Sequence, residues 1–229
     1  MNEIAERLSQ IRSRIAAAAH AAGRPPESVR LIAVSKTKPA TDIRQAYAAG
    51  QRDFGENYVQ ELALKAAELA DLPDLRFHFI GHLQRNKVKN VVAHAHMVHT
   101  VDSVRLAQEL EKRVPQAKAP FAVLVEVNVG GEAQKSGVAP DQVDAVLDAV
   151  DAAESLTLRG LMTVPPWSEA PGETRRYFDA LASLRDRVGG RARLPEMSMG
   201  MSADLEHAIA AGATYVRVGT AIFGERGPK

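Results

Sequence analysis

From residue 31 onward the chain alternates between short apolar runs and longer amphipathic segments, and this alternation constrains its fold most strongly. The apolar runs predict eight strands, at 31–35, 52–55, 77–81, 97–101, 121–129, 156–163, 195–199 and 214–218. Seven segments with helical periodicity lie between them, at 41–49, 57–72, 84–94, 103–114, 140–153, 173–188 and 202–210. Strands that alternate with helices are typical of a parallel sheet covered by helices.

The N-terminal segment supplies one more helix. Within 1–22, apolar residues recur at helical spacing, at Ile4, Leu8, Ile11 and Ile15. Eight strand–helix units in 229 residues match an α/β fold, the (β/α)8 TIM barrel, with an additional N-terminal helix. We therefore predict a single domain over 1–229, with the helix at 1–22 and the barrel at 31–224. An open doubly wound sheet is the main alternative, but no G-x-G-x-x-G sequence follows the first strand.

Composition and charge exclude several classes of protein. The absence of cysteine excludes disulfide bonds and thiolate metal sites. The net charge of +1 produces no strong field that would attract nucleic acid. No segment approaches the roughly 18 uninterrupted apolar residues of a membrane span, and the acidic first residues do not resemble a signal peptide. We expect a cytoplasmic protein with neither nucleic acid nor membrane as a partner.

Chemically distinctive residues follow three of the predicted strands. Lys36 ends the first strand, the segment 198–202 (SMGMS) ends the seventh, and Gly219 and Thr220 follow the eighth. The functional groups of a barrel gather at the carboxyl ends of its strands, and closure puts the eighth strand beside the first. We therefore expect the Lys36 amine to lie close to these small and hydroxylated residues.

The segment 198–202 has the features of an anion site. Ser202 opens a predicted helix whose free N–H groups favour an anion, Gly200 lets the backbone approach closely, and Ser198 or Ser202 can donate a hydroxyl. The alternative is that Ser202 only caps its helix and Gly200 only forms a turn. An amine next to a phosphate site predicts pyridoxal 5'-phosphate (PLP), held as a Schiff base on Lys36.

Arg217 is the third element of the predicted site. Val216 and Val218 share one face of the eighth strand, so Arg217 points into the barrel, where its charge needs a partner. It can donate to the pyridine nitrogen of PLP, or pair with Glu126 in the core, and the two roles are compatible. An arginine at that nitrogen would keep it unprotonated and disfavour carbanion chemistry.

Other candidates are weaker. Asn57, at the end of the second strand, either contacts the cofactor or caps a helix, and Met201 either flanks the ring or fills the core. His78 and His82 share a face of the third strand as ligand contacts or as hydrogen-bonded core residues. We predict no metal site, because no further ligand stands at a familiar spacing from three nearby histidines, His94, His96 and His99.

Seven motifs are typical, in this order, of one family. They are AVSKTK (33–38), FGENYVQE (54–61), HFIGHLQRNK (78–87), VN (127–128), GLM (160–162), SMGMS (198–202) with Asp204, and VRVGTAIFG (216–224). With them the chain resembles the PLP homeostasis proteins, also known as proline synthase co-transcribed proteins. The resemblance implies a barrel like the N-terminal domain of alanine racemase and PLP bound through Lys36. It also implies phosphate held by 198–202 and 219–220, with Arg217 facing the pyridine nitrogen.

The family resemblance also implies a function. It points to supply or buffering of PLP (vitamin B6), with effects on amino-acid metabolism, rather than to a settled reaction. We therefore predict a monomeric PLP carrier without catalytic residues, whose partners are PLP and PLP-dependent apo-enzymes. The alternative is an amino-acid racemase, which needs an acid/base on each face of its substrate. Related racemases take the second base, a tyrosine, from an additional domain for which this chain has no room, and Tyr58 and His82 are not placed as substitutes. If Lys36 is only structural, the barrel binds another phosphorylated ligand.

Overall fold

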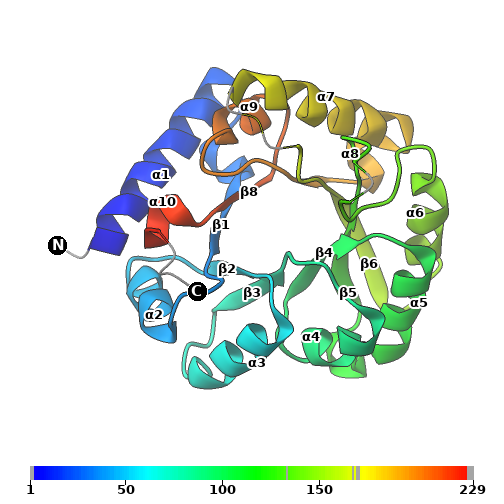
Figure 1. The fold of residues 1–229 in the computed structure, drawn as a ribbon, viewed down its shortest axis with the longest axis horizontal. Helices are drawn as coiled ribbons and strands as arrows, with labels where there is room; N and C mark the ends of the chain where they lie inside the picture. The colour runs from blue at the N-terminus through cyan, green and yellow to red at the C-terminus, as the bar shows by residue number, and fades with distance from the viewer. Residues whose placement is uncertain (1–2, 133, 167, 169–170, 226–229) are drawn as a thin grey trace.

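The computed structural model describes residues 3–132, 134–166, 168 and 171–225. Eight parallel strands close into a barrel in the order of the sequence, with β8 hydrogen-bonded to β1 (Figure 1). The strands are β1 (Arg30–Val34), β2 (Asp53–Glu56), β3 (Arg76–Phe79), β4 (Met97–Val101), β5 (Phe121–Glu126), β6 (Leu156–Met162), β7 (Glu196–Ser198) and β8 (Tyr215–Val218). The predicted (β/α)8 TIM barrel is confirmed, and the open sheet is excluded.

Helices surround the barrel (Figure 1). They are α1 (Glu3–Ala21), α2 (Ala40–Ala48), α3 (Val59–Glu68), α4 (Val88–His94), α5 (Val104–Arg113), α6 (Val143–Asp151), α7 (Pro171–Arg187), α8 (Gly190–Arg193), α9 (Leu205–Ala210) and α10 (Thr220–Phe223). Because α10 has only four residues, α1 covers this part of the barrel and packs against α9, α10 and α2. Within the described part of the chain, no helix is both long enough and apolar enough to cross a membrane.

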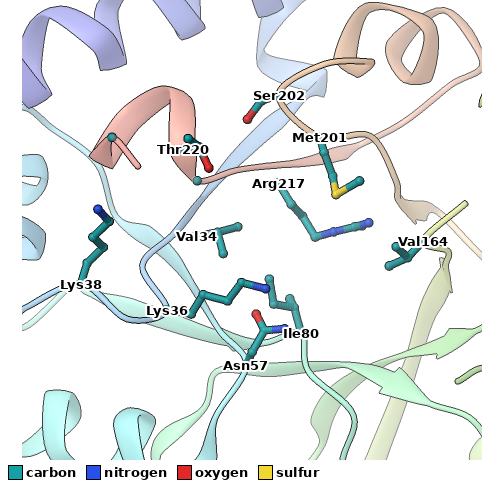
Figure 2. A pocket seen from close by; sticks show the side chains of 12 residues that line it. Val34, Lys36, Lys38, Asn57, Ile80, Val164, Met201, Ser202, Arg217 and Thr220 are labelled. Carbon is teal, nitrogen blue, oxygen red and sulfur yellow. The ribbon is translucent and has the colours of Figure 1, made fainter. Parts of the chain in front are cut away.

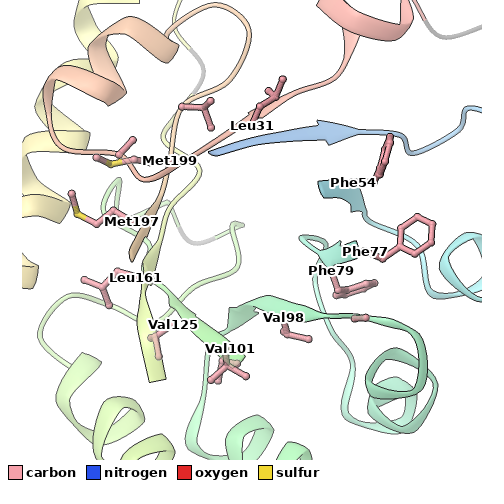
Figure 3. Packing of buried hydrophobic residues seen from close by; sticks show 14 of the residues in the cluster. Leu31, Phe54, Phe77, Phe79, Val98, Val101, Val125, Leu161, Met197 and Met199 are labelled. Carbon is pink, nitrogen blue, oxygen red and sulfur yellow. The ribbon is translucent and has the colours of Figure 1, made fainter. Parts of the chain in front are cut away.

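The apolar side chains form two layers. The larger layer fills the space between strands and helices, and Figure 3 shows part of it, including Phe54, Phe79 and Leu161. The smaller layer lies inside the barrel and consists of Ile32, Met97, Leu124, Met162 and Tyr215. The alternation of side chains along each strand explains the division, because successive residues face opposite sides. Much of the barrel interior is left to buried polar side chains.

The predicted elements differ from the observed ones mainly at the carboxyl ends of the strands. The predicted strand 121–129 ends at Glu126, and the helix predicted from Ser202 begins only at Leu205. Residues between strand and helix leave the regular hydrogen-bond pattern and form the rim of the barrel. This rim carries the site described below.

Candidate functional site

A cavity of about 250 Å³ opens at the carboxyl ends of β1, β2 and β8 (Figure 2). Its lining consists of Val34, Lys36, Lys38, Asn57, Ile80, Val164, Met201, Ser202, Arg217, Gly219, Thr220 and Gly224. The pairing of β1 with β8 brings the two distant parts of the sequence together, with Ala33 opposite Val218. The expected proximity of Lys36 to Ser202, Gly219 and Thr220 is confirmed.

Lys36 lies in a turn two residues beyond the end of β1, rather than at the end of the strand itself. Its side chain extends into the cavity towards Asn57 and Ile80 (Figure 2). Lys38 points in a different direction, and its Nζ donates to the backbone oxygen of Glu225 at 2.6 Å. Of the two lysines, Lys36 therefore presents its amine to the interior of the cavity.

The turn that carries Lys36 has an unusual backbone. Thr37 has a φ of 64°, a left-handed conformation that is uncommon for a residue with a branched side chain. Its N–H donates to the Glu61 Oε2 at 2.7 Å, which ties the turn to α3. Strained residues persist only where their surroundings hold them, so we attribute the position of Lys36 partly to this contact.

A buried lysine that our sequence analysis missed supports the same turn. The Lys65 Nζ donates at 2.8 Å to three acceptors, the Ser35 backbone oxygen, the Glu56 Oε1 and the Glu61 Oε2. Burial raises the pKa of Glu56, and the Lys65 ammonium partly opposes this shift. The signal in the sequence is that Lys65 lies on the buried face of α3, three residues after Leu62.

The hydroxyl groups of Ser202 and Thr220 face the cavity from the side opposite Lys36 (Figure 2). Ser202 does not begin a helix as predicted, since it lies in the turn before α9. The Asp204 Oδ1 accepts the N–H of Met201 at 2.6 Å, and the Arg14 Nη2 donates to the Ser202 backbone oxygen at 3.0 Å. The turn is therefore held by side chains, and what it offers to a predicted anion is a hydroxyl and backbone N–H groups rather than the start of α9.

Ser198 and Gly200 do not belong to the described lining of the cavity. The Ser198 hydroxyl is completely buried and lies 2.9 Å from the His99 Nδ1, so it is directed to the barrel core; of the two predicted hydroxyl donors, Ser202 is the one in the described lining. Gly200 has a φ of 89°, and a Cβ there would lie 2.4 Å from the Cβ of Ala208. Glycine is thus required by the turn, and binding of a phosphate by the backbone of these two residues stays a prediction.

Arg217 points into the barrel as predicted and is 5% exposed. It donates to the Ser198 Oγ at 2.7 Å and to the Thr163 backbone oxygen at 2.9 Å. Burial lowers the pKa of Arg217 to about 10, while Glu126 and Asp204 act in the opposite direction, so the side chain is a cation at neutral pH. Two of its five donors are used in these bonds, which leaves donors for a ligand in the cavity.

Glu126 and Arg217 are not joined by a salt bridge within 4 Å in the described structure, so the predicted core pair is not formed as a direct contact. Glu126 is buried, and among the described residues its Oε2 has no hydrogen-bond partner. Burial raises the pKa of Glu126 from 4.5 to about 7, the Asp102 carboxylate adds to this shift, and Arg217 opposes it.

The raised pKa of Glu126 predicts a pH-dependent stability. In the unfolded chain the carboxyl ionises near its ordinary value of 4.5, so the folded state holds its proton over a higher pH range. The Glu126 contribution to stability is fully present below pH 4.5 and is lost as the pH rises through 7. We expect Glu126→Gln to stabilise the protein by about 2 kcal/mol more at pH 8 than at pH 5, measured by denaturant unfolding. Glu154→Gln, at an exposed position, is the control, and an equal effect of Glu126→Gln at both pH values would contradict the prediction.

The remaining candidates divide into those in the cavity and those outside it. Asn57 lines the cavity and does not cap α3, and its buried Oδ1 has no partner among the described residues. Met201 also lines the cavity and is 38% exposed, so it does not fill the core. His82 is exposed, outside the lining, and lies 3.1 Å from the Ser136 Oγ. The described residues contain no group of three side chains suited to a metal ion.

Comparisons with known proteins agree with this geometry. The family model described as "Alanine racemase, N-terminal domain" matches residues 7–227. A pyridoxal phosphate homeostasis protein of Pseudomonas aeruginosa is 50% identical, with 99% of this chain and 97% of the relative covered. One from Escherichia coli is 45% identical, with coverages of 99% and 98%.

A solved structure extends the comparison to three dimensions. PipY of Synechococcus elongatus, with PLP bound, is 42% identical and superposes with a TM-score of 0.83, covering 96% of this chain and all of that one. The same protein without PLP superposes with a TM-score of 0.87. On these identities and this coverage, the chain belongs to the pyridoxal phosphate homeostasis protein family, within the wider group that shares the alanine racemase N-terminal domain.

Proposed function

We propose that this protein binds PLP as a Schiff base on Lys36 and acts as a carrier or buffer of the cofactor in PLP homeostasis. The observation that carries the proposal is one cavity lined by an amine, Lys36, by two hydroxyl groups facing it, and by a buried guanidinium, Arg217. The relatives named as PLP homeostasis proteins and the relative solved with PLP bound support the assignment.

The residues present fit PLP group by group. The hydroxyls of Ser202 and Thr220, with the backbone at Gly219, suit a phosphate, and Asn57 offers a buried oxygen that has no partner in the described structure. PLP supplies an aldehyde that reacts reversibly with an amine such as that of Lys36. Arg217 would donate to the pyridine nitrogen and keep it unprotonated, which makes the ring a poor electron sink.

The lining of the cavity favours a carrier over a racemase. Racemisation requires an acid/base on each face of the reacting carbon, and Lys36 can serve one face. Among the described lining residues there is no tyrosine, histidine or carboxylate that would serve the other. Tyr58 and His82 are both exposed and lie outside the lining.

Exchange of the α-hydrogen separates the two functions. When the PLP-loaded protein is incubated with L-alanine in deuterated water, we expect no exchange beyond that caused by the same concentration of free PLP, because a second base is lacking. A known alanine racemase serves as the positive control, and NMR detects the loss of the α-proton signal. Exchange that depends on Lys36 would favour the racemase.

Transfer of the cofactor tests the carrier role directly. The loaded protein is mixed with an apo-enzyme that requires PLP, in the presence of a trap for free PLP. We expect the enzyme to regain activity faster than from the same amount of free PLP with the trap. Equal rates would leave PLP binding intact but refute delivery.

A further inference from the structure

A chain of hydrogen bonds runs through the core of the barrel from one end to the other, and we call it the core chain. It consists of Asp53, His78, His99, Ser198 and Arg217, from β2, β3, β4, β7 and β8. Its links are 2.9 Å from the Asp53 Oδ1 to the His78 Nε2, 2.9 Å between the two imidazoles, 2.9 Å from His99 to Ser198, and 2.7 Å from Ser198 to Arg217. All five residues are buried, with at most 9% of the residue surface exposed.

The core chain joins two different places. Asp53 is the first residue of β2 and lies at the amino-terminal end of the barrel, where it also accepts two bonds of 2.8 Å from Arg76. Arg217 lines the cavity at the carboxyl end. The step from His99 to Ser198 crosses the interior between strands that are not neighbours in the sheet.

The ionisation of Asp53 determines which atom donates and which accepts in each hydrogen bond of the core chain. Burial by itself would raise the pKa of Asp53, but hydrogen bonds from Arg76 and His78 hold this pKa well below its ordinary value. An ionised carboxylate only accepts, so the His78 Nε2 carries a hydrogen, and in a singly protonated ring the Nδ1 is then an acceptor. The His99 Nε2 must then donate to His78.

The same reasoning continues to the cavity. The His99 Nδ1 has no hydrogen and accepts the hydroxyl of Ser198, whose oxygen in turn accepts an N–H of Arg217. Burial lowers the pKa of His99 well below 6.5, and the Arg217 guanidinium adds to this shift, which keeps this ring neutral. The Tyr215 ring lies edge-on to the His99 ring, with 5.4 Å between the ring centroids.

We propose that the core chain is a positioning device for Arg217. Starting from Asp53 at the far end of the barrel, the core chain holds the Ser198 oxygen in place as the acceptor of one Arg217 N–H. The other N–H groups of the guanidinium are thereby oriented towards the cavity. With PLP bound, this orientation keeps the pyridine nitrogen an acceptor of a hydrogen bond and excludes its protonation. The inference rests on the proposed function, since it assigns the ligand of Arg217 as the ring nitrogen of PLP.

Asp53→Asn tests the inference from a position that does not line the cavity. Arg76 and His78 both donate to the Asp53 carboxylate. The NH2 group of an asparagine would face one of these two donors, and the hydrogen bond at that position would be lost. Glu196→Gln is the matched control, because Glu196 is also a buried carboxylate at the same end of the barrel and pairs with Arg30 and Arg159, outside the core chain. Ser198→Ala, which removes only one hydroxyl beside Arg217, tests the same chain if Asp53→Asn fails to fold.

Two measurements give the result. PLP affinity by absorbance titration is expected to fall about tenfold in Asp53→Asn and Ser198→Ala, and less than about twofold in Glu196→Gln. The NMR signal of PLP labelled with ¹⁵N in its ring is expected to keep the unprotonated shift in wild type and Glu196→Gln, and to move in the two chain variants. A general loss of packing would weaken binding without moving this signal.

The outcomes separate the inference from the proposed function. If wild type does not bind PLP, the proposed function fails. If wild type binds PLP and the chain variants match Glu196→Gln in affinity and ring-nitrogen shift, the positioning role fails while the proposed function stands. In the cofactor-free wild-type protein, imidazole spectra that show hydrogen on the Nδ1 of His78 or His99 would also overturn it, because the direction of the core chain would be wrong.

Discussion

Lys36→Ala is expected to abolish covalent binding of PLP while leaving the barrel folded. The side chain reaches into the cavity from a turn outside β1, so its removal takes away the only group among the described lining residues that presents an amine to the interior. Because the residue is half-buried and lies in a turn, we expect its replacement to change the free energy of unfolding by less than about 1 kcal/mol. Borohydride reduction followed by mass spectrometry is the measurement, with the PLP adduct on Lys36 in wild type and no adduct in the variant.

Lys38→Ala is the matched control for this experiment. Lys38 lies two residues away and lines the same cavity, but its Nζ is bonded to the Glu225 backbone oxygen. We expect it to retain the adduct on Lys36. An adduct of unchanged yield in Lys36→Ala, or its loss only in Lys38→Ala, would contradict the assignment of the Schiff base.

Gly160→Ala is expected to have the largest effect on stability. Gly160 lies at an irregularity in the pairing of β5 with β6 and has a φ of 153°. A Cβ at this position would lie 1.8 Å from the backbone oxygen of Glu196 on β7, and backbone cannot move aside as a side chain can. Strain and overpacking together predict a loss of about 3 to 5 kcal/mol in the free energy of unfolding, measured with denaturant.

Gly172→Ala provides the comparison. Gly172 is exposed on α7, and a Cβ there meets no atom of the described residues within 4 Å. Alanine favours a helix over glycine, so we expect a change of at most about 1 kcal/mol, in the stabilising direction. Equal stability of the two variants would mean that β6 and β7 move apart readily at Gly160. The prediction that a Cβ at this position destabilises the barrel would then be wrong.

Local pattern was enough to predict the barrel, and particular elements explain why. Residues such as Val216 and Val218 alternate with Arg217, and this period of two identifies both the strand and the face that each side chain takes. The start of α9 was not predictable in the same way. Ser202 is a suitable cap by type, yet the N–H of Met201 is bonded to Asp204, and α9 begins only after it.

Single residues in the site were harder to assign than their neighbourhood. Lys36 and Asn57 were predicted to lie at the ends of the first and second strands, and both line the cavity. Ser198 or Ser202 was predicted to donate a hydroxyl to a phosphate; Ser202 lines the cavity, whereas the Ser198 hydroxyl is bonded inside the barrel. The alternation along a strand predicts which face a side chain takes. Its hydrogen-bond partner depends on residues of other strands, and the sequence alone does not give their positions relative to it.

The sequence by itself determined the number and order of the strands and the arrival of an amine and small hydroxylated residues at one end of the barrel, because periodicity and strand order are properties of the chain. Only the tertiary structure decided how the buried polar groups are paired. The hydrogen bond between Ser198 and His99 joins residues 99 positions apart on strands that are not neighbours. The Lys65 contacts join α3 to the turn after β1. Such bonds form because a buried polar group must find a partner within reach, and closure of the barrel decides which groups are within reach.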